Sequence, residues 1–238
     1  LPFEQLMQLA TGESEELIFP TLNEDYHVEK APPTIPEEWL QQFPALAATH
    51  AGFPYMLTRG FEPADWMIWD TRWDAYRNRV CFPIRDQGGI LRGVQGRAIT
   101  PDAKPKYLHY KHEEQARGAS FWMGEHLLNF DKPVIICEGV FDALAIARVY
   151  PNVVAAMGAA AILKPEKLDR LATSFAIIPF FDGDLAGQKG GEAVKRWCSK
   201  KRLCETVYAP AGRDPGDLHE ETIGELLGEA LGKIGNFL

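Results

Sequence analysis

The chain has few cysteines, and their spacing is uninformative. Its four cysteines, Cys81, Cys137, Cys198 and Cys204, are scattered, and no two form a C-x-x-C pair. The usual spacing of a zinc site is therefore missing, and a disulfide framework is not expected in a chain of 238 residues. We predict no zinc in this chain and small, buried cysteines in a reducing cytoplasm.

Long apolar runs are also missing. No stretch approaches the ~18–20 apolar residues that span a bilayer. The first residues, LPFEQLMQ, lack the charged and apolar regions of a signal peptide. The sequence therefore predicts a cytoplasmic protein with no membrane partner. The first residue is not Met, which we interpret as a processed chain or an excised fragment.

The net charge of −8 argues at first against a polyanionic partner. Residues 1–50, however, hold nine acidic side chains and one lysine, which accounts for the whole excess. Residues 72–117 hold ten basic side chains against five acidic ones. A basic strip beside a carboxylate-rich strip could hold both nucleic-acid phosphates and metal ions.

Composition divides the chain into four segments. Residues 1–36 are acidic, end in A-P-P-T-I-P and predict an arm or linker. Residues 37–130 carry the basic strip and predict a small α+β subdomain. Within it, two apolar runs flank Gly88-Gly89, which indicates a β-hairpin over 79–99.

The second half of the chain has a different rhythm. In residues 131–218, apolar runs at 134–137, 153–156, 175–181 and 205–208 alternate with helical patterns. This alternation predicts an α/β fold, a Rossmann-like parallel sheet with helices on both faces. Pro179 is awkward within a central strand. Residues 219–238 predict an amphipathic C-terminal helix.

Acidic side chains collect where these predicted strands end. In a parallel sheet, ligands bind at the carboxyl ends of the strands. Carboxylate oxygens are ligands that Mg²⁺ prefers, and acids from neighbouring strands could hold two ions ~3.5–4 Å apart for displacement at phosphorus. The acids are Glu138 and Asp142 after the first strand, Asp182 and Asp184 after the third, and Asp214 and Asp217 after the last.

Each acid also has a purely structural interpretation. Asp-Gly-Asp is a common turn, Glu138 could cap the following helix, and Asp142 could be a first-turn helix acid. An acid that ends one buried strand, together with D-G-D at the end of another, is less expected by chance. The combination of the two motifs therefore favours a functional role for these acids over a purely structural one.

At these positions the sequence resembles the Toprim domain of DnaG-type primases, topoisomerases and some nucleases. The signatures E-G-x-x-D and D-x-D match E-G-V-F-D at 138–142 and D-G-D-L-A-G at 182–187. Gly158 stands where the family has a glycine turn after its second strand.

Upstream motifs favour the primase branch. F-P-I-R-D at 82–86, G-R at 96–97 and P-K-Y-L at 105–108 are similar to the N-terminal half of a bacterial or phage primase core. The resemblance covers roughly residues 55–218. The family's zinc ribbon and helicase-binding module are not in this sequence, so a replicative helicase would bind through regions outside this chain.

The resemblance implies an RNA polymerase core that makes short primers for DNA replication. Its partners would be a single-stranded DNA template, ribonucleoside triphosphates and the RNA–DNA hybrid, and its cofactor Mg²⁺ or Mn²⁺. Glu138, Asp182 and Asp184 would be catalytic and bind metal, with Asp142 and Asp214 as further ligands. Whether Glu138 is a ligand or a general base stays open.

The resemblance also implies a groove for template and nucleotide, lined by basic and aromatic side chains. The expected residues are Arg79, Arg85, Arg97, Lys106, Tyr107, His109 and Arg117.

The chain departs from the family pattern at three places. His109 replaces a common Asn, Ala116-Arg117-Gly118 replaces H-K-G, and D-P-G-D replaces D-P-D, which favours Asp214 over Asp217. Two alternatives remain: a Toprim nuclease that uses similar carboxylates, and a non-catalytic module that binds single-stranded nucleic acid.

Overall fold

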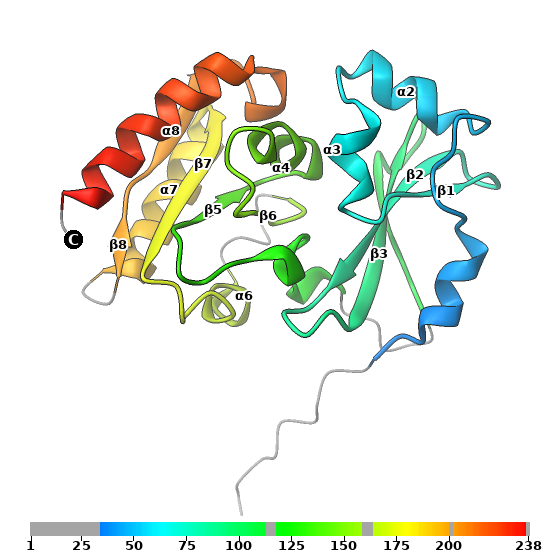
Figure 1. Cartoon of the computed structure of the whole chain (residues 1–238), viewed down its shortest axis with the longest axis horizontal. Coiled ribbons are helices and arrows are strands. Elements are labelled where there is room, and N and C mark those ends of the chain that lie inside the picture. The colour runs from blue at the N-terminus through cyan, green and yellow to red at the C-terminus, as the bar shows by residue number, and fades with distance from the viewer. Residues whose placement is uncertain (1–33, 113–117, 159–163, 200–201, 237–238) are drawn as a thin grey trace, which may run out of the picture. The chain divides into compact units, whose positions relative to one another are not determined.

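Two β-sheets, each with its own helices, form the described part of the chain (Figure 1). This computed structural model describes residues 34–112, 118–158, 164–199 and 202–236. The arm predicted for residues 1–36 lies outside the described residues except for its last three positions. None of the described helices is both long and apolar enough to cross a membrane.

The first sheet is antiparallel and has the strand order β1-β2-β3-β4. Its strands are β1 (Arg72–Asp74), β2 (Arg79–Arg85), β3 (Leu91–Ala98) and β4 (Tyr107–Tyr110). The predicted hairpin is confirmed, because β2 and β3 pair antiparallel from Arg79↔Ala98 to Arg85↔Leu91. Gly89 in the turn has φ +77°, a conformation that favours glycine.

Short helices precede and follow this sheet. They are η1 (Glu37–Gln42), α2 (Gly52–Thr58) and α3 (Pro63–Met67) before it, and η2 (Gly118–Ser120) and η3 (Glu125–Leu127) after it. η1 is a 3₁₀ helix that begins after Pro36. α2 begins at Gly52 and is followed by Arg59 and Gly60, the latter with φ +83°.

The second sheet is parallel, as predicted, with the order β6-β5-β7-β8 and with β9 also paired to β7. Along the chain its elements are β5 (Val134–Cys137), α4 (Val140–Ala147), β6 (Val153–Ala155), α6 (Pro165–Asp169), β7 (Ala176–Gly183), α7 (Leu185–Cys198), β8 (Leu203–Cys204), β9 (Val207–Ala211), η4 (Pro215–Asp217) and α8 (Glu220–Gly235).

The single last strand predicted at 205–208 is wrong, because the structure has two short strands there. β8 pairs with β7 at Ala176 and Ile177, whereas β9 pairs with it from Phe180 onward. Pro179 lies between these two pairings and cannot donate a backbone hydrogen bond. The edge strand beside β7 is therefore interrupted at Pro179, a residue type that is unfavourable in a central strand.

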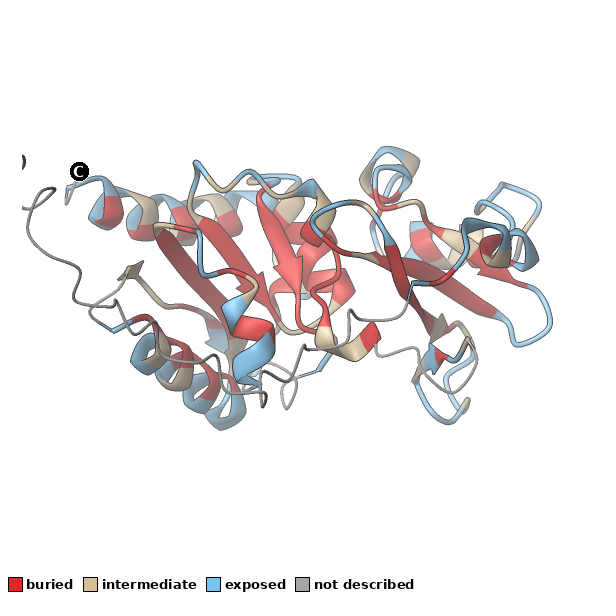
Figure 2. Cartoon of the chain, turned by 90° about the horizontal axis from the view of Figure 1, so that it is seen from below, coloured by how far each residue is buried: buried red, intermediate tan, exposed pale blue. Residues whose placement is uncertain are grey.

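Alternating residues of the parallel strands face two separate apolar clusters, which confirms helices on both faces. Ile135 and Ile178 belong to a cluster with α4, α8 and apolar residues of the first sheet. Ile136 and Ile177 belong to a cluster with α6 and α7. Figure 2 shows the central strands buried along most of their length. The predicted C-terminal helix is α8, which buries Ile223, Leu227, Ala230 and Ile234.

Candidate active site at the carboxyl edge of the parallel sheet

The structure brings the predicted carboxylates to one edge of the parallel sheet. Glu138 follows β5, Asp182 lies near the end of β7, and Asp184 caps α7. Asp214 directly precedes η4, after β9. Since β5 and β9 both pair with β7 in parallel, the ends of all three strands meet at this edge.

These carboxylates lie close enough to repel one another. Burial, followed by the charges of Asp182, Asp184 and Asp214, raises the pKa of Glu138 to about 7. Burial, followed by Asp214 and Asp184, raises the pKa of Asp182 to about 6. An arrangement that raises the pKa of acids is unfavourable without a cation, because like charges are held together in a partly dry site.

Asp142 has a structural role that its place in the signature did not reveal. Its side chain is buried, with Oδ2 accepting from the Gly139 amide at 2.9 Å and Oδ1 accepting from the Gly216 amide at 3.0 Å. These bonds tie the start of α4 to the loop that carries Asp214. Burial and the charge of Asp214 raise the pKa of Asp142 to about 8.

Asp184 combines a cap with an exposed carboxylate. Its Oδ1 accepts a hydrogen bond from the Gly187 amide at 2.8 Å, which satisfies one free amide of the first turn of α7. A Cβ at Gly187 would lie 2.2 Å from the carbonyl oxygen of Asp182. The glycine therefore lets the helix start directly against the strand end, which keeps Asp182 and Asp184 beside each other.

Gly183 is required for packing against β9. A Cβ there would lie 2.3 Å from the Pro210 carbonyl oxygen. The backbone of β9 therefore fills the space beside Gly183, and no phosphate fits there.

One carboxylate oxygen at this edge has no partner. Oδ1 of Asp214 is buried and makes no hydrogen bond, which is costly for an acceptor unless a cation or donor binds it. Within the described residues, no group of three or more acidic, histidine or cysteine side chains is placed so that it could hold a metal ion. The chemistry of the side chains nevertheless suits a hard divalent cation, since Mg²⁺ is usually bound through one or two carboxylates together with waters and substrate phosphates.

Cations gather around the ring of Phe141, next to these carboxylates. The Arg59 guanidinium lies 4.7 Å from the ring centroid and that of Arg97 lies 5.7 Å away. The rings of Tyr55, Phe61 and Phe82 also contact Phe141, which holds it in place. The arrangement puts positive charge beside the acidic edge.

Arg97 and Tyr107 form a cross-strand pair in this region. They are opposite each other in β3 and β4, and the guanidinium lies 4.9 Å from the Tyr107 ring centroid. Burial raises the pKa of Tyr107, with Asp142 contributing in the same direction, so the pair lies near the carboxylates. Lys106 is exposed, and His109 is exposed with a ring nitrogen 3.1 Å from Gln95 Nε2.

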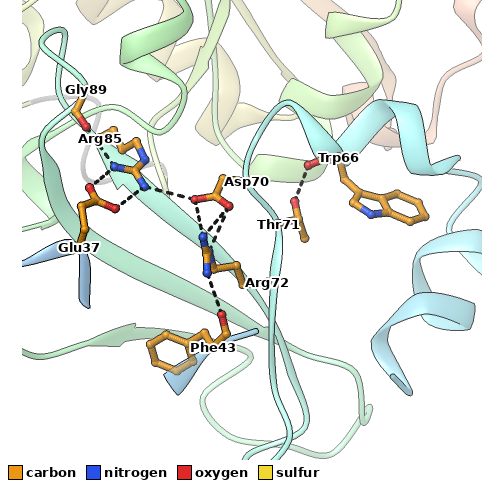
Figure 3. Close-up of polar contacts among 8 residues, drawn as sticks. All are labelled: Glu37, Phe43, Trp66, Asp70, Thr71, Arg72, Arg85 and Gly89. Atoms are coloured by element: carbon orange, nitrogen blue, oxygen red, sulfur yellow. Dashed lines mark hydrogen bonds and ion pairs between the residues drawn. The ribbon is translucent and has the colours of Figure 1, made fainter. Parts of the chain in front are cut away.

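Two arginines predicted to bind phosphate are instead engaged within the protein. Arg79 is buried and donates to the carbonyl oxygens of Pro105, Gly96 and Lys106. Figure 3 shows the second, Arg85, between Glu37 and Asp70, with a further bond to the Gly89 carbonyl at 3.1 Å. Asp70 is shared with Arg72 in the same network. Arg117 lies outside the described residues.

A cavity of about 550 Å³ adjoins the Asp214 loop. Arg59, Arg148 and His219 line it together with Gly216 and Asp217. Arg148 is paired with Asp65 and with Glu220, the latter at 3.5 Å, whereas Arg59 has no carboxylate partner among the described residues. Sequence reasoning missed Arg59, because a single arginine before a glycine carries no signal that it stacks on Phe141.

A parallel sheet with carboxylates at its carboxyl edge, beside cations from a preceding antiparallel sheet, suits a protein that binds phosphates and divalent metal. Residues 135–219 match the family described as Toprim-like, and residues 52–127 match the N-terminal domain of the DNA primase catalytic core. The two matches follow one another along the chain, so residues 52–219 are similar to the catalytic core of DnaG-type DNA primases, which includes a Toprim domain. Toprim domains generally bind Mg²⁺.

Individual relatives agree with this assignment. The DNA primase of Pseudomonas putida KT2440 is 34% identical over 161 residues, which are 62% of this chain and 23% of that protein. A DNA primase domain from Pseudomonas aeruginosa is 31% identical with a TM-score of 0.51, over 68% of this chain and 53% of that one.

A DnaG primase catalytic domain bound to single-stranded DNA has a TM-score of 0.65 at 20% identity, over 82% of this chain and 76% of that one. That likeness confirms the fold. The chain spans about a quarter of the length of the curated relatives it matches. The predicted domain boundaries and the roles of individual site residues stay predictions.

Proposed function

We propose that this chain is the catalytic core of a DNA primase that makes short RNA from ribonucleoside triphosphates on single-stranded DNA. The observation that carries the proposal is the carboxylate edge, with its raised pKa values and the unpartnered Asp214 oxygen, in a chain similar to primase catalytic cores. A similar catalytic domain is bound to single-stranded DNA. A helicase partner would need regions outside this chain.

Asp182, Asp184 and Asp214 are the proposed ligands of Mg²⁺ or Mn²⁺, with Glu138 beside them. When bound, the cation neutralises the triphosphate and lowers the pKa of the attacking hydroxyl. Asp142 is a positioning residue in this scheme, because both of its oxygens are occupied by backbone amides. Its bond to Gly216 holds the loop that presents Asp214.

Glu138 is the candidate general base. Its pKa of about 7 suits a group that accepts a proton near neutral pH. In the reaction, the 3′-oxygen of one nucleotide bonds to the α-phosphorus of the next, pyrophosphate leaves, and the hydroxyl proton passes to the base. The same side chain as a metal ligand is the alternative.

Arg59 and Arg97 are the proposed phosphate-binding cations. Both lie against Phe141, whose neighbour in sequence is Asp142, and neither forms an ion pair among the described residues. Stacking on an aromatic ring orients a guanidinium and leaves its edge free to donate hydrogen bonds. Lys106, directly before β4, and Tyr107, its first residue, extend this surface, and Tyr107 is the proposed platform for stacking on a base.

The test is RNA synthesis from labelled ribonucleotides on single-stranded DNA with Mg²⁺ or Mn²⁺. The parent chain and Asp131→Ala, an exposed acid outside the edge, should make short RNA, whereas Asp182→Ala should lose activity by about a hundredfold or more. No product from the parent, with a supplied primer also not extended, would contradict the proposal. Cleavage of the template would favour a nuclease, and binding alone would favour a non-catalytic module.

A further inference from the structure

A second cavity lies at the opposite end of α7 from the carboxylates. Its volume is about 270 Å³, and two cysteines line it together with cationic and anionic side chains. Cys198 is the last residue of α7, and Cys204 ends β8. The other charged lining residues are Lys195, Arg202 and Glu205.

Both thiols line this cavity, and Cys204 packs against the apolar cluster that contains Cys198. The neighbouring Cys204 thiol and the charge of Arg202 lower the pKa of Cys198, although burial acts in the opposite direction. The interaction with Cys198, together with burial, raises the pKa of Cys204. Cys81 and Cys137 differ, because burial raises the pKa of Cys81 to about 12 and that of Cys137 well above its usual value.

Arg202 has buried donors with no acceptor. Its Nε and Nη1 are buried and make no hydrogen bond, while Nη2 donates to the Ala172 carbonyl oxygen at 3.2 Å. The guanidinium is also stacked on Trp197, with Cζ 3.9 Å from the ring centroid. A cation fixed in this way, with free donors beside a pair of thiols, stabilises a thiolate.

We propose that Cys198 and Cys204 are a redox-active dithiol that a small peroxide converts into an intramolecular disulfide. The Cys198 thiolate attacks one oxygen of hydrogen peroxide, and the other oxygen leaves as hydroxide, which is protonated to water. The Cys204 thiol then attacks the sulfenic sulfur, and a second water leaves. Two thiols are oxidised by two electrons, and one peroxide is reduced to two waters.

The burial of Cys198 limits the size of an oxidant that can reach its sulfur. Cys198 is 1% exposed, so a bulky disulfide reagent meets its sulfur only through the cavity. A peroxide is small enough to enter, whereas Cys81 and Cys137 are fully buried and remain protonated thiols. The inference is independent of the proposed polymerase activity, because neither cysteine belongs to the carboxylate edge.

The test is peroxide oxidation of the whole chain, followed by alkylation of free thiols and mass spectrometry. The parent should lose ~2 Da and two alkylation sites, and digestion should yield the 198–204 linkage. Cys204→Ser should instead accumulate a sulfenic acid at Cys198, which dimedone traps. Persistence of four alkylated thiols, or a linkage through Cys81 or Cys137, would overturn the proposal.

A variant pair tests the role of Arg202. Arg202→Met should slow disulfide formation by about tenfold, as a rise of one unit in the thiolate pKa would give. Arg196→Met makes the same change at an exposed position of α7 and should leave the rate unchanged. Equal rates in both variants would show that Arg202 does not activate the thiol. The disulfide itself is mapped in the parent chain, so that result does not depend on any variant.

Discussion

The two sheets differ in how their charged side chains are arranged. In the antiparallel sheet, Arg92 and Arg85 are paired with carboxylates: Arg92 Nη2 lies 2.7 Å from Asp86, and Arg85 lies between Glu37 and Asp70. At the carboxyl edge of the parallel sheet, like charges lie together and raise one another's pKa. Opposite charges in contact offset each other's cost of burial, whereas an uncompensated cluster of like charges needs an external cation.

The arginines show the same contrast between charges that are bound within the protein and charges that are left available. The terminal nitrogens of Arg79 and Arg85 donate to carbonyl or carboxylate oxygens, but Arg59 and Arg97 rest mainly on aromatic rings. A high density of basic residues in the sequence therefore overstates how much positive charge is free to bind phosphate.

The largest expected effect concerns pH at the acidic edge. Without metal, the folded chain holds a proton on Asp142 up to a pKa of about 8, while the unfolded chain releases it near the ordinary aspartate pKa of 3.8. Stability is therefore present at low pH and is lost as pH rises, by roughly 3–5 kcal/mol between pH 5 and 8.

This pH dependence can be measured by urea unfolding in EDTA. Asp142→Asn should reduce it by the part that comes from this carboxyl. Glu138, Asp182 and the histidines also titrate in this range, but both proteins share them, so they are compared against the same background. Added Mg²⁺ should restore stability in the parent at pH 8, because a ligand of the folded state stabilises it. A parent whose stability does not fall from pH 5 to 8 relative to the variant would contradict the raised pKa of this carboxyl.

A smaller effect is expected from breaking a pair in the antiparallel sheet. Asp86 accepts from the backbone amides of Gly88 and Ile90 as well as pairing with Arg92. Asp86→Ala leaves these groups without their acceptor and should lower the free energy of unfolding by about 3 kcal/mol. The exposed Asp102 provides a control, because Asp102→Ala should change it by less than about 0.5 kcal/mol. Similar values for both would argue that the pairing contributes little.

The smallest expected effect is on nucleotide binding, and it distinguishes an arginine that binds phosphate from one that stabilises the fold. Arg59→Ala should raise the KM for nucleotide by about tenfold with the Tm nearly unchanged, since a charge-assisted hydrogen bond contributes about 1.5–3 kcal/mol. Arg85→Ala should lower the Tm and change KM by less than about twofold, because its ion pairs lie within the protein. Primer-synthesis kinetics and thermal melts on the two variants measure both quantities. The reverse pattern would restore Arg85 as a binding residue.

The sequence predicted the parallel sheet because buried strands read as continuous apolar runs at 134–137 and 175–181. It also predicted that the carboxylates would meet, since parallel strands end at a common edge. The sequence did not predict the break between β8 and β9. That break depends on which edge strand pairs with β7 on each side of Pro179.

Contacts between distant segments were beyond sequence reasoning. Glu37 and Arg85 are 48 positions apart, so their ion pair has no local signal. The same holds for Asp142 and Gly216, which are 74 positions apart. Motif matching identified Asp142 as an acid of the site, but only its two amide partners show that it positions the Asp214 loop.

The most direct test of the central claim is Mn²⁺ binding, measured by electron paramagnetic resonance on the metal-free chain. The account predicts specific binding by the parent that weakens as pH falls below about 6, where the Asp182 carboxyl becomes protonated. It predicts at least a tenfold loss of affinity in Asp182→Asn and Asp214→Asn, with Asp131→Asn unchanged. Equal binding by all four proteins would show that the carboxyl edge is not the metal site.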